Sequence, residues 1–503
     1  MTRKRTTHPK GTARPDVGHS PPTDETPPRA LPRRKKLIFG LVAAVLIAGL
    51  LIGGLEVALR VAGYGYPAGF FVRHPAHDQP ISNAQFGRRF FPPAIARVPT
   101  PLAVTDPKPR GAFRIFVMGG SAALGTPAPH YGFSRILEVM LAETFPDARI
   151  EVINTAMVAI NSHVVRSIAA DCADWQPDLF IVYLGNNEVV GPFGAGTVFQ
   201  GATDNLTLLR TGLWFRKFRA GQWVASLFAG SDTGGQRFTE WKGMEFFLDN
   251  RVSADDPRLT TVYASFARNL SAICDTATGA GAGTILCTVG VNLKDSAPFA
   301  STPDAPRDDA TAKGPWAEAY QAGLAHLAEG NAVAALAALQ QAEALDDKSA
   351  DLQFHLGTCR AAQGETQAAR EHFARARDLD ELRFRADTRI NQTIRDVAAQ
   401  AGPRVKLVDV ARLLETDTQG TARIPGNDLF YEHCHYRFAG NYALASHVFP
   451  AVVSALPKRI RGDTQRAMPI PTLDRCAARL AHTRWDAHAI AQQVRDKMSH
   501  PPY

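Results

Sequence analysis

The stretch RIFVMGGSAALG, residues 114–125, begins with residues that fit a buried strand and then passes through two glycines to a serine. A strand that ends on Gly-Gly and leads into small residues is typical of a tight strand-to-helix turn. The turn is selected either for its backbone alone or because it presents the Ser121 hydroxyl. A phosphate-binding loop would carry Gly-Lys-Ser/Thr at this point, and this stretch does not.

Around this turn, continuous apolar runs alternate with amphipathic segments. We expect strands at 113–119, 149–156, 177–187, 284–290 and 404–410, and helices at 132–146, 164–175, 262–283 and 392–402. This alternation predicts an α/β fold, a parallel sheet flanked by helices on both faces. Ligands of such folds bind beyond the carboxyl ends of the strands.

The basic charge of the chain is concentrated at its N-terminus. The 503 residues have a formal net charge of +8, and residues 1–36 contain ten Lys/Arg against three Asp/Glu. The remaining residues are therefore almost neutral, which argues against a nucleic-acid-binding surface. Residues 1–36 are also rich in Pro and Thr with almost no large apolar side chains, so we expect a disordered cytoplasmic tail.

Residues 37–55 are apolar and uncharged, and nineteen residues are enough to cross the hydrocarbon core of a bilayer. The competing interpretation is a cleaved signal peptide, but no Ala-x-Ala site follows. We therefore predict a transmembrane signal anchor at 37–62. Because the preceding basic cluster should remain in the cytoplasm, the rest of the chain should be extracytoplasmic, which is periplasmic in a Gram-negative cell.

After the anchor we expect a proline-rich juxtamembrane collar at 63–110, and then a catalytic-type domain in two parts, 111–312 and 383–460. Between these parts, Gly323, Gly330, Ala335, Leu339 and Ala342 recur 34 residues later as Gly357, Gly364, Ala369, Phe373 and Ala376. This period resembles tetratricopeptide repeats, and it predicts an all-α insertion at 313–382. The insertion is either a groove for a protein partner or a structural buttress. Residues 461–503 should form a C-terminal helical extension.

One further segment leaves alternatives open. Residues 190–260 mix glycines, aromatic residues and positive charge, which favours an excursion packed over the sheet; a lid or a lipid-contacting patch is the alternative.

The six cysteines are widely spaced without a C-x-x-C pair, so the sequence identifies no disulfide. The HCH sequence at 433–435 lacks further ligands at convincing spacing, and we expect neither a metal nor another cofactor.

Candidate catalytic groups follow several of these strands. A nucleophilic Ser121 would need a general base and donors for an oxyanion. Asn187 follows the third strand, and the loop 156–159 after the second strand offers backbone N–H groups. Far downstream, the sequence FYEHCHYRFAGN places Glu432, His433 and His435 directly before a helix.

These separated blocks, in this order, resemble the SGNH/GDSL-type hydrolases. GGSAALG resembles the nucleophile block, NTAMVAINS the block that donates a backbone N–H, GNNE the Gly-x-Asn-Asp block and EHCH the Asp-x-x-His block. The resemblance spans about 111–300 and 383–460. It departs from the family at Gly120 and Glu432, where the family has aspartates, and at Glu188, which replaces the last residue of Gly-x-Asn-Asp.

The resemblance implies that Ser121 is the nucleophile, His435 the base and Glu432 the acid that orients it. It further implies an oxyanion hole built from the N–H groups of Ser121 and Ala159 and the Asn187 side chain. The alternatives are Ala156 for Ala159, Asp428 for Glu432 and His433 for His435. Possible substrate contacts are His163, which the sequence pattern suggests is exposed, and Glu188 and His433.

The expected function is a membrane-anchored extracytoplasmic serine esterase that acts on an acylated small molecule or on an O-acylated cell-envelope glycan. An O-acyltransferase that uses the same triad is the first alternative. A catalytically silent adaptor, whose repeats recruit a protein partner to an envelope assembly, is the second.

Overall fold

The computed structural model describes residues 33–199, 205–228, 243–301, 314–417, 419–462 and 469–503, and the chain divides into two units, Met1–Ala62 and Gly63–Tyr503. The first unit contains α1, Arg33–Val61, whose stretch Leu37–Val61 has a mean hydropathy of 2.6. This helix is long and apolar enough to cross a membrane, judged by length and composition alone. Residues 33–36, expected in the tail, belong to this helix, and the rest of the expected tail lies outside the described residues.

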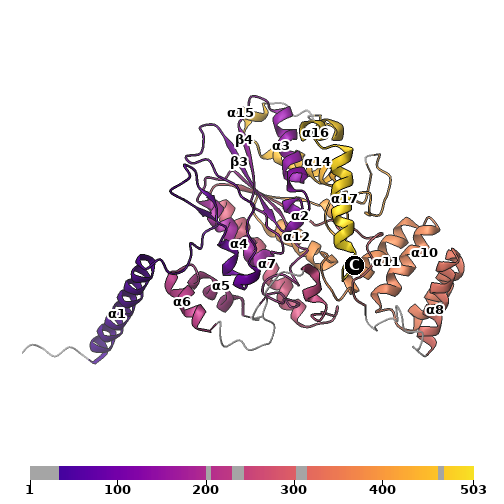
Figure 1. The fold of residues 1–503 in the computed structure, drawn as a ribbon, viewed down its shortest axis with the longest axis horizontal. Coiled ribbons are helices and arrows are strands. Elements are labelled where there is room, and N and C mark those ends of the chain that lie inside the picture. The colour runs from indigo at the N-terminus through magenta and orange to yellow at the C-terminus, as the bar shows by residue number, and fades with distance from the viewer. Residues whose placement is uncertain (1–32, 200–204, 229–242, 302–313, 418, 463–468) are drawn as a thin grey trace, which may run out of the picture. The chain divides into compact units, whose positions relative to one another are not determined.

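The second unit is built on a five-stranded parallel sheet with the order β4-β3-β5-β6-β7 (Figure 1). The strands are β3 Phe113–Gly119, β4 Ile150–Asn154, β5 Leu179–Tyr183, β6 Gly283–Cys287 and β7 Val405–Val408. Every residue of β3 and β5 is buried, as continuous apolar runs require in a sheet that is covered on both faces. The sheet that the sequence predicts is therefore present.

Helices cover both faces of this sheet (Figure 1). On one face α3 packs against α14, and on the other α7 packs against both α4 and α12. Their bounds are α3 Phe133–Thr144, α4 Ser162–Ala173, α7 Arg258–Gly279, α12 Thr388–Gln400 and α14 Phe438–Ala455. All strands run in one direction, so the turns that follow β3, β4 and β5 lie at one edge of the sheet.

The first glycine of the Gly-Gly turn is required by the sheet itself. A Cβ added to Gly119 would lie 2.0 Å from the carbonyl oxygen of Tyr183 on the neighbouring strand. No side chain fits there, so β3 and β5 approach closely at the point where the chain turns toward Ser121.

Residues 63–110 contribute aromatic side chains to the main core. Short strands β1 Phe71–Val72 and β2 Ile81–Ser82 pair antiparallel, and the short helices η1 Phe86–Arg89 and η2 Pro93–Ile95 follow. Phe70, Phe86 and Phe91 are buried in the same apolar cluster as β3. The predicted collar is thus held by packing rather than by regular structure.

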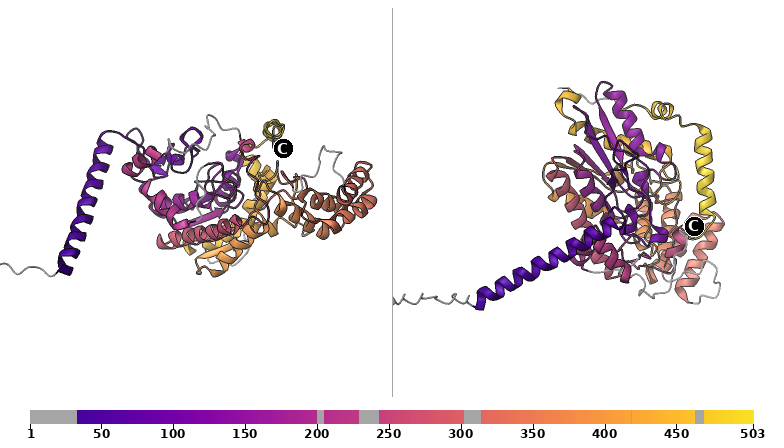
Figure 2. Two further views of the ribbon diagram at one scale, coloured as in Figure 1. Left: turned by 90° about the horizontal axis from the view of Figure 1, so that it is seen from below. Right: turned by 60° about the vertical axis from the view of Figure 1, so that its left-hand side comes forward.

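The predicted insertion between the last two strands forms two helical hairpins, which project from the sheet as an arm in Figures 1 and 2. The helices are α8 Pro315–Ala328, α9 Ala332–Leu345, α10 Ala350–Ala362 and α11 Thr366–Leu379. A Cβ on Gly323 would lie 2.5 Å from the Leu339 side chain, and one on Gly357 would lie 2.9 Å from the Phe373 ring. The 34-residue period therefore corresponds to repeated packing, in which a glycine of one helix receives a large side chain of the next.

The remaining elements lie near the site or beside the sheet. They are α2 Ser121–Leu124, η3 Pro129–Tyr131, α5 Leu206–Phe215, α6 Arg219–Phe228, η4 Gly243–Phe247, α13 Val410–Leu413, α15 Lys458–Arg461, α16 Leu473–Arg479 and α17 Arg484–Met498. Within residues 190–260, Phe199, Phe247 and Val252 are buried in the main core. All six cysteines are buried and free.

Candidate functional site

Ser121 is the first residue of α2, directly after the Gly119–Gly120 turn that ends β3. Gly120 lies beside Asn187, because a Cβ added to Gly120 would lie 3.2 Å from the side-chain nitrogen of Asn187. The turn thus brings two polar groups together. Gly119 thus has a steric cause, and the serine hydroxyl emerges at the carboxyl edge of the sheet.

Ser121, His435 and Glu432 form a continuous chain of contacts. His435 Nε2 lies 2.7 Å from Ser121 Oγ, and His435 Nδ1 lies 2.5 Å from Glu432 Oε1. The same Oε1 accepts a 2.7 Å hydrogen bond from the backbone N–H of His435. Two donors on one oxygen therefore fix the carboxylate against the ring, and the ring presents its other nitrogen to the serine.

The second oxygen of Glu432 is held by residues that the sequence analysis did not connect to it. The hydroxyl of Tyr503 donates to Glu432 Oε2 at 2.8 Å and lies 2.9 Å from His433 Nδ1. His433 Nδ1 also contacts the same carboxylate. Tyr503 belongs to the segment after α17, and no sequence signal links it to residue 432 because the contact depends only on how the C-terminal extension folds back.

The charges of this cluster are strongly coupled. Burial raises the pKa of the Glu432 carboxyl, but His433 and His435 outweigh it and hold that pKa well below its usual range. Burial lowers the pKa of His435, but Cys434 and Glu432 outweigh this effect and raise the pKa well above its usual range. For His433 the same opposing causes raise the pKa to about 9. A buried carboxylate that stabilises imidazolium is the arrangement that a serine–histidine pair needs.

The groups expected to form an oxyanion hole border the same cavity as Ser121. Ala159 and Asn187 both line it, and Asn187 Nδ2 donates to the carbonyl of Ile160 at 3.1 Å. Ala159 has a φ of 59°, a left-handed backbone in which an L-residue is strained. The N–H of Ala156 is already bonded to Asn154 Oδ1 at 3.0 Å, which leaves Ala159 as the better placed of the two alternatives.

Asp428 does not contact His435 in the arrangement that the structure describes. Its carboxylate accepts from Arg423 at 3.5 Å and from the backbone N–H of Gly426 at 3.2 Å. Of the two acids that the sequence leaves open, Glu432 is therefore the one that contacts His435. His433, the alternative base and possible substrate contact, is buried, lines the same cavity as Ser121 and contacts Glu432 and Tyr503.

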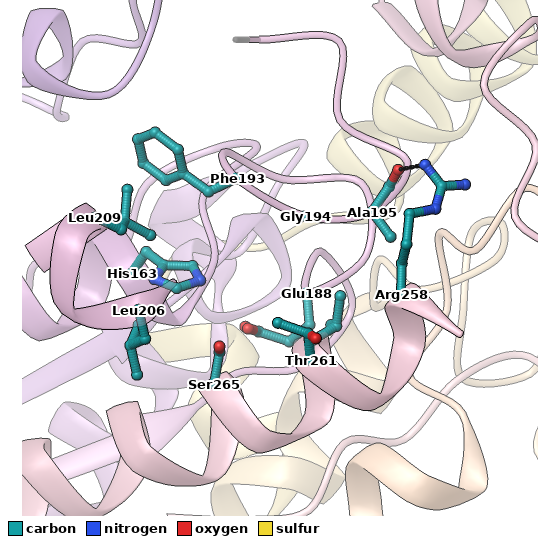
Figure 3. Close-up of a pocket in the computed structure, with 11 residues that line it drawn as sticks. His163, Glu188, Phe193, Gly194, Ala195, Leu206, Leu209, Arg258, Thr261 and Ser265 are labelled. Carbon is teal, nitrogen blue, oxygen red and sulfur yellow. Dashed lines mark hydrogen bonds between the residues drawn. The ribbon is translucent and has the colours of Figure 1, made fainter. Parts of the chain in front are cut away.

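His163 and Glu188 lie in a different cavity, shown in Figure 3. His163 is buried on α4, where its Nδ1 accepts from Asn269 at 3.2 Å, and its burial and nearby arginines lower its pKa to about 4. Glu188 accepts from the backbone N–H of Ser162 at 2.9 Å and from its hydroxyl at 2.7 Å, and burial raises its pKa to about 7. The expected exposure of His163 is wrong, because α4 packs this side chain against α7.

The cavity of Figure 3 is small. It has a volume of about 30 Å³, close to the space of one water molecule, and Arg258 closes one side through a 3.0 Å hydrogen bond to the Ala195 carbonyl. Neither Ser121 nor His435 lines it. Glu188 therefore supports the loop and the start of α4, and it does not reach the serine.

The cavity beside Ser121 is much larger, about 500 Å³. Ser121, Asn187 and His435 line it, together with apolar side chains from η4 and α17. A volume of this size accommodates a small organic molecule.

Within the described residues, Glu432, Cys434 and His435 are the one trio whose ligand atoms lie close enough together, within 4.8 Å, to hold a metal ion. Both ring nitrogens of His435 already have partners, Glu432 on one side and Ser121 on the other. This pairing favours acid–base chemistry at the imidazole over metal ligation.

Comparisons with known proteins find distant likenesses in fold only. No family model and no curated protein matches the chain. Among solved structures, TesA has 13% sequence identity and a TM-score of 0.27, with 68% of this chain and 99% of TesA covered. A catalytic mutant of Axe2, an acetylxylan esterase from Geobacillus stearothermophilus, has 10% identity and a TM-score of 0.30 over 71% of this chain and 97% of Axe2. The acetyl xylan esterase AlAXEase has 11% identity and a TM-score of 0.29 over 68% and 100%.

These values are too low to assign an activity to this chain.

Proposed function

We propose that this protein is a serine ester hydrolase with Ser121 as nucleophile, His435 as general base and Glu432 as the acid that orients the imidazole. The observation that carries the proposal is the unbroken series of contacts from Ser121 Oγ through His435 to Glu432 Oε1. The four sequence blocks that resemble SGNH/GDSL-type hydrolases support it, since they contribute the groups that line one cavity.

In the proposed first step, Ser121 Oγ attacks the ester carbonyl carbon while its proton passes to His435 Nε2. The carbonyl oxygen becomes an oxyanion that the N–H groups of Ser121 and Ala159 and the Asn187 amide would stabilise, each donor contributing about 3 kcal/mol. Collapse expels the alcohol, which takes the proton from His435, and leaves an acyl ester on Ser121.

In the second step, water attacks the acyl ester and gives its proton to His435. The acid leaves, and the proton returns to Ser121. If a sugar hydroxyl replaced water, the same site would act as an O-acyltransferase. We retain this alternative because both reactions use the same groups.

The proposed setting is the outer side of a membrane, with α1 as the anchor, and the proposed substrate class includes an O-acylated cell-envelope glycan. The anchor proposal is supported by the length and hydropathy of α1. The repeat-like hairpins α8–α11 would either bind a protein partner or brace the sheet. A silent adaptor is less well supported, because an adaptor has no need of an aligned serine, imidazole and carboxylate.

The test is hydrolysis of a chromogenic ester by the full chain in detergent micelles, comparing Ser121→Ala with Ser454→Ala. Ser454 is exposed on α14 and serves as a matched serine-to-alanine control. We expect Ser121→Ala to lose at least about 10⁴-fold in kcat with an unchanged Tm, and Ser454→Ala to retain full activity. Retained turnover in Ser121→Ala would refute the proposal.

A further inference from the structure

The cavity beside Ser121 is closed on one side by the C-terminal extension, which lies outside the four sequence blocks. Val494 and Met498 are four residues apart on α17 and therefore share one helix face, and both line the cavity. After α17 the chain continues along the cavity through Pro501 to Tyr503. The yellow helix α17 in Figure 1 is this wall.

This wall is fixed at both ends to the catalytic loop. Before α17, the ring of His482 stacks on Phe438 with 4.1 Å between ring centroids, and Phe438 begins the helix that follows His435. After α17, Tyr503 donates to Glu432. Thr483 and Asp486 form a capping box that starts the helix between these two anchors. The extension thus contacts both the acid of the triad and the first residue of α14.

Further apolar side chains line the cavity from outside the C-terminal extension. Met244 and Phe247 come from η4, and Phe384 comes from the chain that leaves the helical insertion. Phe247 and Phe384 are 3% and 5% exposed and pack edge to face with ring centroids 5.4 Å apart. Polar side chains line the cavity as well: the triad and Asn187, and Lys497 and His500 of the C-terminal extension.

We propose that this cavity binds an aliphatic chain of the ester substrate, considerably longer than an acetyl group, and that α17 sets the chain length. This inference rests on the proposed esterase function and names its substrate class. An acetyl group would leave most of the 500 Å³ unfilled, whereas each methylene that enters an apolar cavity is removed from water. The expected gain in kcat/KM is about threefold to fourfold for each methylene until the chain fills the cavity.

The aliphatic chain can belong to the acyl group or to the alcohol of the ester, and two substrate series distinguish these two cases. One series keeps p-nitrophenol as the leaving group and lengthens the acyl chain from acetyl to dodecanoyl. The other keeps acetate and lengthens the alcohol. The enzyme is the full chain in detergent micelles, and a fluorophosphonate titration of the same sample counts the reactive Ser121 sites.

The variants are Val494→Trp and Met498→Trp, which place a large ring in the cavity, and Gln492→Trp, which adds the same ring on the exposed side of α17. We expect the ratio of kcat/KM for octanoyl over acetyl esters, or for octyl over methyl acetate, to exceed about 100 in the natural protein. This ratio should fall at least tenfold in Val494→Trp and Met498→Trp and stay the same in Gln492→Trp. Met498 is 36% exposed whereas Val494 is 6% exposed, so the Met498 variant should fold even if Val494→Trp does not.

A flat or falling dependence on chain length in both series would overturn this inference, and fluorophosphonate labelling of Ser121 in that sample would show that the esterase proposal still stands. Absence of labelling would overturn the esterase proposal itself. A chain-length dependence that survives in both tryptophan variants would overturn the assignment to α17.

Discussion

The Nε2 atom of His435 lies 2.7 Å from the Oγ atom of Ser121, although 314 positions separate these residues in the chain. Ser121 follows the second strand of the sheet order, and His435 lies in the loop that precedes α14. The parallel sheet brings the two residues together, because the loops that follow its strands all lie at the same edge of the sheet. The functional proposals depend on this convergence.

The raised pKa of His435 predicts that the acid limb of the pH profile of kcat/KM is shifted to higher pH. A general base acts only when neutral, so activity should rise as the pH passes upward through this pKa. Because Cys434 and Glu432 raise it despite burial, the limb should lie above about 6.5, the ordinary pKa of histidine. Glu432→Gln should lower kcat by about 10³-fold to 10⁴-fold and move the limb to lower pH. An acid limb that stays in place in this variant would show that Glu432 does not act on His435.

Tyr503 is predicted to act as a positioning residue for Glu432. In Tyr503→Phe the ring still lines the cavity but the hydrogen bond to Glu432 Oε2 is lost. We expect kcat to fall about tenfold while KM is unchanged, since a lost hydrogen bond to a charged group costs about 1.5–3 kcal/mol and His433 still contacts that oxygen. Tyr503→Ala, which also removes the ring, should raise KM as well. An unchanged kcat in Tyr503→Phe would mean that the hydroxyl does not position Glu432.

Ala159→Gly should stabilise the protein by up to about 1 kcal/mol. Ala159 has a φ of 59°, where alanine is strained and glycine is not. Ala156→Gly is the control, because its backbone is not in the left-handed region, and it should lower stability. Urea unfolding followed by far-ultraviolet circular dichroism measures both. A lower unfolding free energy for Ala159→Gly would contradict the backbone geometry described at this loop.

Gly357→Val should lower the unfolding free energy by about 1–3 kcal/mol, because the added carbons meet the buried ring of Phe373. Gly212 also lies within a helix, α5, but a Cβ there meets nothing within 4 Å. Gly212→Val should therefore be neutral or slightly stabilising. Equal effects of the two substitutions in thermal unfolding would contradict the glycine–aromatic packing of the hairpins.

The parts of the fold that the sequence predicts are those with local signals. Continuous apolar runs such as 113–119 require burial on both faces, and the parallel sheet follows from their alternation with helices. The positions of Ser121, Asn187 and His435 at one cavity follow in the same way, because each comes after a strand or before a helix at the carboxyl edge.

What the sequence did not predict depends on tertiary packing. His163 looks like a loop residue in the sequence, but α4 begins at Ser162 and turns the ring toward Asn269 of α7. Tyr503 contacts Glu432 only because α17 folds back across the cavity. The local sequence pattern does not predict this tertiary packing. The choice between Glu432 and Asp428 likewise required the loop geometry.

The most direct test of the proposed catalytic role is covalent labelling of the full chain with a fluorophosphonate, followed by peptide mass spectrometry. We predict one phosphonyl group on Ser121, no labelling in His435→Ala, and faster labelling as the pH rises through the pKa of His435. Folded natural protein that remains unlabelled at Ser121 over this pH range would contradict it.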